Sequence, residues 1–216
     1  MCSRVPPSST LHGWDECETE KHTFSISAAF SMIPALRDAT SNDLPAIASI
    51  YEEAVLNGTA SYEITPPDLA EMQRRFQAIT AQGYPYIVAV DEDGEVAGYA
   101  YASAFRTRPA YRWLVEDSIY IARKGRGKGI GRLLLKELVL RCTALGFRQM
   151  VAVIGGASPA SVAVHRSCGF RMVGTLNGTG FKHEQWLDTI FMQIALGDGD
   201  TSDPDPRSYP GTLFAG

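Results

Sequence analysis

The chain has 216 residues, of which 45% are hydrophobic, and it carries a formal net charge of −4. This length predicts one domain with a sizeable core, while the acidic balance argues against a nucleic-acid partner. No apolar run reaches the roughly 20 residues that a membrane-spanning helix needs, so no membrane association is expected.

The four cysteines stand at Cys2, Cys17, Cys142 and Cys168. Their spacing matches neither a metal-ligand motif nor a disulfide framework. Free thiols are typical of a reducing compartment, so we expect a cytoplasmic protein without a structural metal. The first 31 residues are acidic and lack a basic segment followed by a long apolar one, which argues against a signal or transit peptide.

Composition divides the chain into three parts. We predict a poorly ordered extension over residues 1–31, a folded domain over 32–197, and a flexible tail rich in Gly, Asp and Pro over 198–216. The role of the extension stays open, and so does whether translation starts at Met1 or near Met32.

Hydrophobic periodicity and capping residues predict the elements in chain order. The first half is predicted to contain a strand at 33–37, helices at 44–56 and 66–82, and strands at 86–90 and 96–105. The second half is predicted to contain a strand at 113–121, a helix to 145, a strand at 150–154, a short helix at 160–167, and strands at 170–175 and 187–195. This order predicts a mixed, mostly antiparallel sheet flanked by helices, an α+β fold.

The other elements are organised around residues 116–145. A strand ends at Ile119-Tyr120-Ile121, glycines follow at every second position from Gly125 to Gly131, and an amphipathic helix comes next. Glycine permits positive φ and close approach to a ligand. A helix N-terminus offers unpaired N–H groups and the positive end of its dipole. The segment therefore predicts a cradle for a phosphate or pyrophosphate.

Two common phosphate motifs do not fit this segment. Lys128 is not followed by Gly-Lys-Ser/Thr, and a dinucleotide-binding glycine run should open the first βαβ unit. Residues 126–131, Arg-Gly-Lys-Gly-Ile-Gly, instead resemble the Arg/Gln-x-x-Gly-x-Gly/Ala signature of the GCN5-related N-acetyltransferases (GNAT). Composition alone leaves a plain glycine-rich turn open.

The resemblance extends over roughly residues 33–196 and is closest to the phosphinothricin and methionine sulfoximine N-acetyltransferases. The matching stretches are VEDSIYI at 115–121, VAVIG at 151–155, SVAVH at 161–165 with Gly169-Phe170, and TGFKH at 179–183 with Trp186 and Asp188. The resemblance implies acetyl transfer from acetyl-coenzyme A to the α-amine of a small L-amino-acid-like substrate. It also implies a homodimer, to which Trp186–Phe191 would contribute.

The same resemblance assigns acetyl-coenzyme A contacts along this region. The pyrophosphate is expected at Arg126, Gly127, Lys128, Gly129, Ile130, Gly131 and Arg132. The thioester is expected beside the backbone of Ile119, Tyr120 and Ile121, where the strand splays from its neighbour and free N–H groups polarise the carbonyl. Ser158 stands where the family often has an asparagine that contacts pantetheine, or it simply caps the following helix.

The expected catalytic residues are Glu116 and His165. An amino-acid amine is protonated at neutral pH, so transfer requires a general base. Glu116 lies in an apolar strand, where burial would raise its pKa, and the family assigns this position that role in direct transfer. An exposed or ion-paired carboxylate is the alternative, and Asp117 alternates to the other face. His165 stands where many acetyltransferases have a tyrosine that protonates the departing thiolate, or it is structural.

The acceptor's carboxylate needs a cation, and Arg106 and Arg108 lie just before the Glu116 strand. Solvated loop arginines are the alternative. The other expected substrate residues are Tyr62, Thr107, Tyr111, Glu116, Asp117 and Ser118. Glu63 stands where the phosphinothricin branch has arginine, so we expect it to repel a phosphinate and favour methionine sulfoximine or sulfone. The natural acceptor stays open.

Two other functions stay open at this level. The first is a protein or polyamine N-acetyltransferase, which the arginine-bearing loop does not favour. The second is a non-catalytic acyl-coenzyme A sensor, against which the presence of both Glu116 and His165 argues.

Overall fold

The computed structural model describes residues 34–210, and the expectations for residues 1–31 and 211–216 lie outside that range. The strands are β1 (Ala35–Asp38), β2 (Tyr86–Val90), β3 (Val96–Ala104), β4 (Leu114–Ile121), β5 (Gln149–Gly155), β6 (Arg171–Lys182) and β7 (Gln185–Ala195). The α-helices are α1 (Leu44–Asn57), α2 (Leu69–Ala81), α3 (Ile130–Ala144) and α4 (Pro159–Ser167). In this range no helix combines the length and apolar character needed to cross a bilayer.

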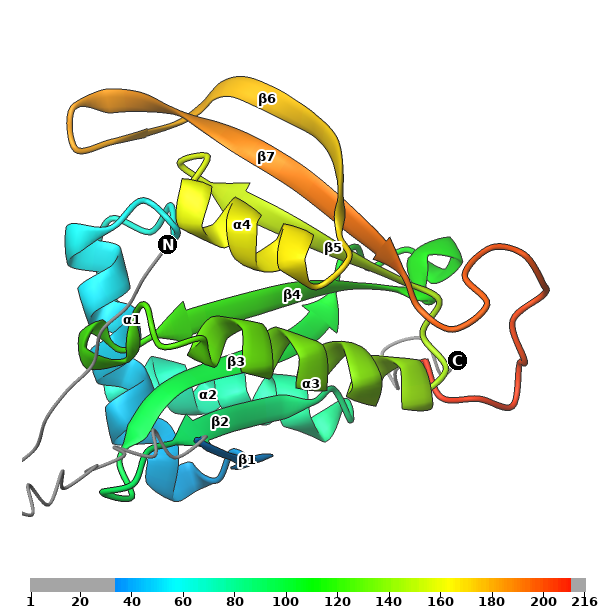
Figure 1. The fold of residues 1–216 in the computed structure, drawn as a ribbon, viewed down its shortest axis with the longest axis horizontal. Coiled ribbons are helices and arrows are strands. Elements are labelled where there is room, and N and C mark those ends of the chain that lie inside the picture. Colours follow the sequence, from blue (N-terminus) through cyan, green and yellow to red (C-terminus); the bar gives the residue numbers. More distant parts are fainter. Residues whose placement is uncertain (1–33, 211–216) are drawn as a thin grey trace, which may run out of the picture. The chain divides into compact units, whose positions relative to one another are not determined.

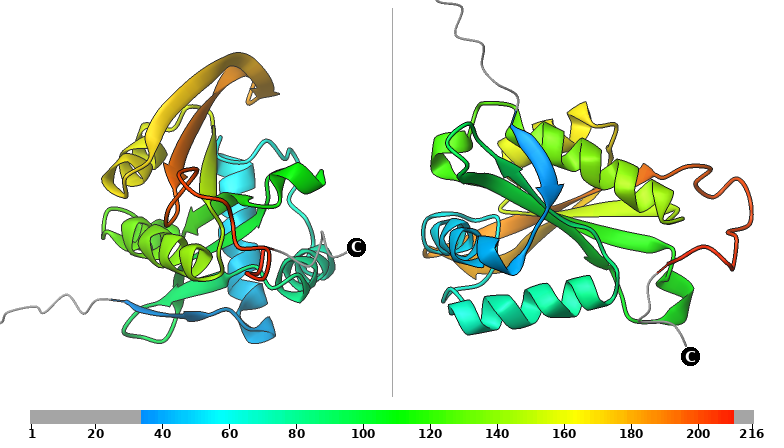
Figure 2. Two further views of the ribbon diagram at one scale, coloured as in Figure 1. Left: turned by 90° about the vertical axis from the view of Figure 1, so that its right-hand side faces the viewer. Right: turned by 90° about the horizontal axis from the view of Figure 1, so that it is seen from below.

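The strands form one sheet in the order β1-β2-β3-β4-β5-β7-β6 (Figure 1). Neighbouring strands are antiparallel except β4 and β5, which are parallel and joined through α3. Helices α1 and α2 cover one face of the sheet, and α3 and α4 cover the other (Figure 2). This arrangement confirms the predicted α+β class with a mixed, mostly antiparallel sheet.

Strand β4 presents alternate side chains to the two faces. Val115 and Ile119 pack in the core cluster that contains α3, whereas Tyr120 packs in the cluster that contains α1. Asp117 shares the α3 and α4 side, where it contacts α4. Glu116 has the opposite parity, so the two neighbouring carboxylates are separated by the sheet as alternation predicts.

Strands β4 and β5 pair over only part of their length. Their register ends at Asp117 opposite Ala152. Beyond that point β4 continues to Ile121 and β5 to Gly155 without pairing to each other. The adjoining edges therefore carry main-chain groups that have no strand partner, which is the splay that the resemblance implied.

The last two strands form a long hairpin that extends past α4 (Figure 1). Strand β6 continues to Lys182, beyond the predicted end at Thr175, and its turn places His183 and Glu184 at φ +51° and +60°. Most β6 side chains are exposed. They form no alternating apolar pattern, so sequence periodicity could not detect the extension.

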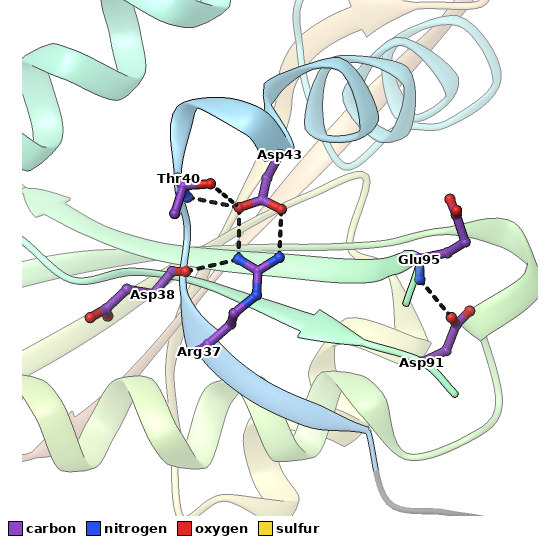
Figure 3. Close-up of polar contacts among 6 residues, drawn as sticks. All are labelled: Arg37, Asp38, Thr40, Asp43, Asp91 and Glu95. Atoms are coloured by element: carbon purple, nitrogen blue, oxygen red, sulfur yellow. Dashed lines mark hydrogen bonds and ion pairs between the residues drawn. The ribbon is translucent and has the colours of Figure 1, made fainter. Parts of the chain in front are cut away.

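An arginine fork joins β1 to the start of α1 (Figure 3). Arg37 donates from both terminal nitrogens to Asp43, at 2.8 and 2.7 Å, and the backbone N–H of Thr40 donates to the same carboxylate at 2.7 Å. The hydrogen bond from Arg37, more than any other cause, lowers the pKa of Asp43 to about 2. Figure 3 also shows Asp91 accepting from the N–H of Glu95, and this 2.9 Å hydrogen bond closes the turn between β2 and β3.

The chain after β7 packs against the folded body as far as residue 209. The guanidinium of Arg148 donates to the carbonyl oxygens of Gly199 and Ser202 at 2.7 and 2.8 Å. The ring of Tyr209 packs edge-on against Tyr84 and Phe147. These contacts lie beyond the predicted domain end at residue 197, because aromatic residues in a polar tail can find a distant apolar surface.

Candidate functional site

Two adjoining cavities open where β4 and β5 separate. The splay cavity, about 290 Å³, is lined by β4 from Glu116 to Tyr120 and by β5 from Ala152 to Gly155. The glycine-loop cavity, about 600 Å³, is lined by the end of β4, the glycine-rich turn and α4. The residues that line both are Ala60, Ile119, Tyr120, Ser158, Ser161 and His165. The two cavities therefore share one wall.

Glu116 lines the splay cavity and is half-buried. Burial raises the pKa of its carboxyl to about 7, the charge of Asp117 adds to the rise, and the charge of Arg106 opposes it. A carboxyl that titrates near neutral pH can accept a proton from an ammonium group and release it again.

Glycines shape the turn from β4 into α3. Gly127 and Gly129 adopt φ values of +75° and +79°, and a Cβ at either position would meet no other atom within 4 Å. The backbone conformation, rather than lack of space, therefore favours glycine here. Gly129 precedes the first turn of α3, whose leading N–H groups have no acceptor within the helix. These donors adjoin the glycine-loop cavity and suit an anion.

Most residues predicted to bind acetyl-coenzyme A line this cavity: Ile119, Tyr120, Ile121, Arg126, Gly127, Gly129, Ile130, Gly131, Arg132 and Ser158. Lys128 is exposed and lines neither cavity. Arg126 forms an ion pair with Glu53 from α1 and donates to the carbonyl of Ile121 at 3.4 Å. Its guanidinium is thus held beside the turn by contacts within the protein.

His165 of the shared wall pairs with Asp117, which lines the splay cavity alone. Nε2 of His165 lies 3.0 Å from Oδ2 of Asp117, and the two side chains are 5% and 2% exposed. Nδ1 lies 2.7 Å from the carbonyl oxygen of Ser161 and 3.3 Å from its hydroxyl. Burial lowers the pKa of His165, but the hydrogen bond to Asp117, its charge and the Ser161 carbonyl together raise that pKa above its usual value.

The structure divides the residues predicted to bind substrate. Those that line the splay cavity are Tyr62, Glu116, Asp117 and Ser118. Arg106 is exposed, with its guanidinium 4.1 Å from the centre of the Phe105 ring, and its charge acts on Glu116. The remaining three, which are exposed and line neither cavity, are Thr107, Arg108 and Tyr111.

Glu63 does not occupy the position that its expected role requires. It lines neither cavity, and its carboxylate accepts from Arg75 at 2.6 Å. Arg75 belongs to α2, so sequence distance concealed this partner. The ion pair offsets part of the negative charge of Glu63, which weakens the physical basis of the expected repulsion of a phosphinate.

The loop at residues 59–62, of which only Tyr62 was predicted as a site residue, contributes to both cavities: Thr59 lines the glycine-loop cavity, Ser61 and Tyr62 line the splay cavity, and Ala60 lines both. Tyr62 donates from its hydroxyl to the carbonyl of Asp188 at 3.0 Å, and Lys182 donates to the carbonyl of Ser61 at 2.7 Å. Lys182 is 4% exposed, and burial lowers its pKa. The β6–β7 hairpin therefore fixes this loop. Lys182 lies inside the TGFKH stretch, which was the available signal.

Sequence reasoning also missed Ser161 as a functional candidate. It stands four residues before His165 on α4, and this spacing places two helical side chains on one face. The spacing was visible in the sequence, but only the tertiary structure shows that this face meets both cavities. Within residues 34–210, no group of three or more His, Cys, Asp or Glu side chains is arranged to bind a metal ion.

Comparison with known proteins gives consistent matches. A family model described as an acetyltransferase (GNAT) domain matches residues 36–191. A phosphinothricin N-acetyltransferase of Alcaligenes faecalis is 41% identical over 200 residues, which cover 92% of this chain and 100% of that protein. An L-methionine sulfoximine/L-methionine sulfone acetyltransferase of Pseudomonas paraeruginosa is 44% identical over 165 residues, 76% of this chain and 96% of that protein.

A solved structure gives the same result. The crystal structure of a GNAT superfamily phosphinothricin acetyltransferase from Sinorhizobium meliloti, in complex with AcCoA, aligns with a TM-score of 0.83 and 62% identity. The alignment covers 85% of this chain and 99% of that one. The residues matched by the family model include β4, the glycine-rich turn, α3, β5 and α4, which form most of the walls of both cavities.

Proposed function

We propose that this chain, which belongs to the GNAT family of N-acetyltransferases, acetylates the α-amine of a small L-amino-acid-like substrate. The acetyl donor is acetyl-coenzyme A, and transfer to the amine is direct. One observation carries the proposal: a half-buried carboxyl with a pKa of about 7 lines a cavity that adjoins a glycine-loop cavity suited to an anion.

Acetyl-coenzyme A would supply an acetyl group activated as a thioester. Its pyrophosphate fits the N–H donors at the start of α3 and the charges of Arg126 and Arg132, all of which adjoin the glycine-loop cavity. The splay between β4 and β5 supports binding of the acyl group there, because the β4 edge at residues 119–121 has no partner in β5. Main-chain N–H groups there would orient the acyl group and stabilise negative charge on its oxygen.

Glu116 acts as the general base. The acceptor nitrogen can attack only after its ammonium form loses a proton, and Glu116 lies in the cavity where that nitrogen would stand. With a pKa of about 7, a substantial fraction of the carboxyl is ionised at neutral pH and still basic enough to take the proton. The proton then leaves through the open side of the splay cavity.

The acceptor class follows from the relatives and from the charges near Glu116. The relatives are named for phosphinothricin and for L-methionine sulfoximine or sulfone, all small amino-acid-like amines. Arg106 lies within electrostatic range of Glu116, so it can hold an acceptor carboxylate near the base. The small volume of the splay cavity, about 290 Å³, favours such an acceptor over a peptide.

A thiol-release assay with acetyl-coenzyme A tests this function. Single acceptors would be L-methionine sulfoximine, L-methionine sulfone, L-phosphinothricin, common L-amino acids, a polyamine and a lysine peptide. We expect turnover on the first three and its loss in Glu116→Gln. Turnover confined to the polyamine or peptide would overturn the acceptor class. Binding of acetyl-coenzyme A without turnover on any acceptor would favour a sensor.

We also propose that the protein is a homodimer that uses the β6–β7 hairpin. Large apolar side chains are exposed there, including Leu176 at 51%, Phe181 at 57% and Trp186 at 70%. Monomeric proteins rarely expose such a group together. Light scattering of the wild-type protein and of Trp186→Glu tests this. The wild-type mass should correspond to two chains and the mass of the variant to one chain. A wild-type mass of one chain would exclude the dimer.

A further inference from the structure

Two polar side chains of the wall shared by the two cavities, Ser161 and His165, connect to a third, Asp117, which lines the splay cavity alone. Asp117 on β4 contacts His165 on α4, and His165 contacts Ser161 one turn earlier. We propose that these three side chains form a proton path in which the Ser161 hydroxyl protonates the sulfur that leaves during acetyl transfer. This inference rests on the proposed function and adds Ser161 as a catalytic residue, with Asp117 as a positioning residue.

Hydrogen-bond geometry places one mobile proton in this group. Nδ1 of His165 lies 2.7 Å from a carbonyl oxygen, which can only accept, so Nδ1 carries a hydrogen. Nε2 lies 3.0 Å from a carboxylate oxygen of Asp117, and these two atoms must have a proton between them. The pair is therefore neutral overall and stores a proton that a solitary neutral histidine would lack.

Exposure selects Ser161 as the group that meets the sulfur. The side chains of His165 and Asp117 are 5% and 2% exposed. His165 also lines both cavities, but both of its ring nitrogens already have protein partners. Ser161 is half-buried and lines both cavities. Its hydroxyl, 3.3 Å from Nδ1, can share the Nδ1 hydrogen with the Ser161 carbonyl while donating its own hydrogen into the glycine-loop cavity.

The cost of burying this pair argues for a functional role. Oδ1 of Asp117 is buried and has no hydrogen-bond partner among the described residues. A buried ion pair seldom adds stability compared with apolar side chains of similar size, and an unpaired carboxylate oxygen makes the balance worse. A site that keeps such an arrangement next to its substrate cavities uses it for chemistry.

The surroundings of His165 explain why it retains its proton. Asp117 faces it from β4, Ser161 from its own helix, and Phe170 presents its ring edge-on at 5.0 Å. Cys142 of α3 interacts with Asp117, but burial raises the pKa of that thiol well above its usual value, so the thiol stays protonated at neutral pH. Glu116 is the other acid close to Asp117. The charge of Asp117 therefore dominates and keeps the pKa of His165 above its usual value.

The proton transfer balances as follows. The O–H bond of Ser161 breaks and an S–H bond forms at the departing sulfur. The N–H bond at Nδ1 of His165 breaks and restores the Ser161 hydroxyl, which leaves a neutral imidazole that donates from Nε2 to ionised Asp117. Glu116 has by then passed the ammonium proton to solvent, and it takes the second nitrogen proton as the amide forms. Exchange with solvent returns one proton to the pair and removes one from Glu116.

The stored proton can be tested without turnover. In protein labelled with ¹⁵N-histidine, His165→Asn identifies the His165 signals among the four histidines. We expect the ring in the wild-type protein to titrate above the usual value of about 6.5 and to move to lower pH in Asp117→Asn. A ring that titrates identically in wild type and Asp117→Asn would overturn the stored proton.

Kinetics test the role of Ser161. With saturating acceptor, Ser161→Ala should lower kcat by about 10²-fold, leave the KM for acetyl-coenzyme A within about twofold, and remove the fall of kcat at high pH. Ser161→Thr, which keeps the hydroxyl, should recover much of kcat. Ser167→Ala is the matched control, because Ser167 is an exposed serine of α4 that lines neither cavity.

The outcomes separate this inference from the proposed function. Wild-type kcat and an unchanged alkaline limb in Ser161→Ala would overturn the path while acetyl transfer stands. An acetyl group found on Ser161 by mass spectrometry would also overturn it, because Ser161 would then attack rather than donate. A wild-type protein that turns over no acceptor would reject the proposed function, and the histidine titration would still decide the stored proton.

Discussion

At the scale of single residues, Glu116 is a carboxyl whose burial moves its titration toward neutral pH. Burial raises its pKa to about 7, and only the ionised form can accept a proton. We therefore expect kcat/KM to rise with pH through about 7 on its acid side, separately from the fall at high pH that follows loss of the His165 proton. Glu116→Gln should lower kcat by about 10²- to 10⁴-fold across this range, measured by thiol release.

Glu52→Gln is the control for this substitution, because Glu52 is an exposed glutamate on α1 outside both cavities. It should leave kcat and the pH profile unchanged. A Glu116→Gln variant that kept its activity and its rise through pH 7 would exclude Glu116 as the base.

Glu63 illustrates how one ion pair changes a specificity argument. Because Arg75 offsets part of its charge and it lies outside the cavity lining, we expect Glu63→Gln to leave the preference between acceptors unchanged. The ratio of kcat/KM for L-phosphinothricin to that for L-methionine sulfoximine should stay within about twofold. A rise in this ratio of tenfold or more would restore the repulsion predicted from the sequence.

At the scale of elements, the Arg37–Asp43 fork holds β1 against the start of α1. The pKa of Asp43 is about 2, below its ordinary 3.8, so the ionised form is the one that folding favours. Its contribution is fully present above pH 3.8 and is lost as pH falls through about 2. Asp43→Asn should lower the free energy of unfolding by roughly 1 to 2 kcal/mol at pH 7.

Urea unfolding at several pH values measures this effect. The difference between wild type and Asp43→Asn should shrink as the pH approaches 2, because protonation removes the same charge. Glu52→Gln again serves as the control and should show no such difference. An Asp43→Asn variant as stable as wild type at pH 7 would show that the ion pair with half-exposed Arg37 contributes little to the free energy of unfolding.

The glycine-rich turn makes a prediction about an element and its ligand together. Gly129 and Gly94 both have positive φ, +79° and +82°, with open space at Cβ, but only Gly129 lies at the cavity. Gly129→Ala and Gly94→Ala should each cost about 1 kcal/mol of stability. Only Gly129→Ala should raise the KM for acetyl-coenzyme A, and equal KM values in both variants would contradict the cradle.

At the scale of the whole molecule, the chain beyond β7 extends the folded body. We propose that the domain reaches to about residue 209, since Tyr209 packs on Tyr84 and Phe147. A chain ending at residue 197 lacks the ring of Tyr209. Its free energy of unfolding should therefore fall by about 2 kcal/mol and its melting temperature by roughly 4 to 8 °C. A chain ending at 210 is the control, and equal melting temperatures would place the boundary at 197.

Some features of this protein depend on residues close together in the chain, and these were predictable. The glycine run with Gly127 and Gly129, the period-two alternation that separates Glu116 from Asp117, and the turn at Asp91 all express local backbone preferences. The long β6 strand escaped prediction, because its exposed side chains carry no periodic signal.

Other features depend on residues that only folding brings together. Alternation assigned Asp117 to the other face of β4, but it could not show that His165, 48 positions later in the chain, contacts Asp117 on that face. Glu63 pairs with Arg75 of α2, and Lys182 of β6 donates to the carbonyl of Ser61. These pairings could not be read from the chain, because short local patterns specify a residue's face and element, whereas burial and distant contacts decide which charge it meets.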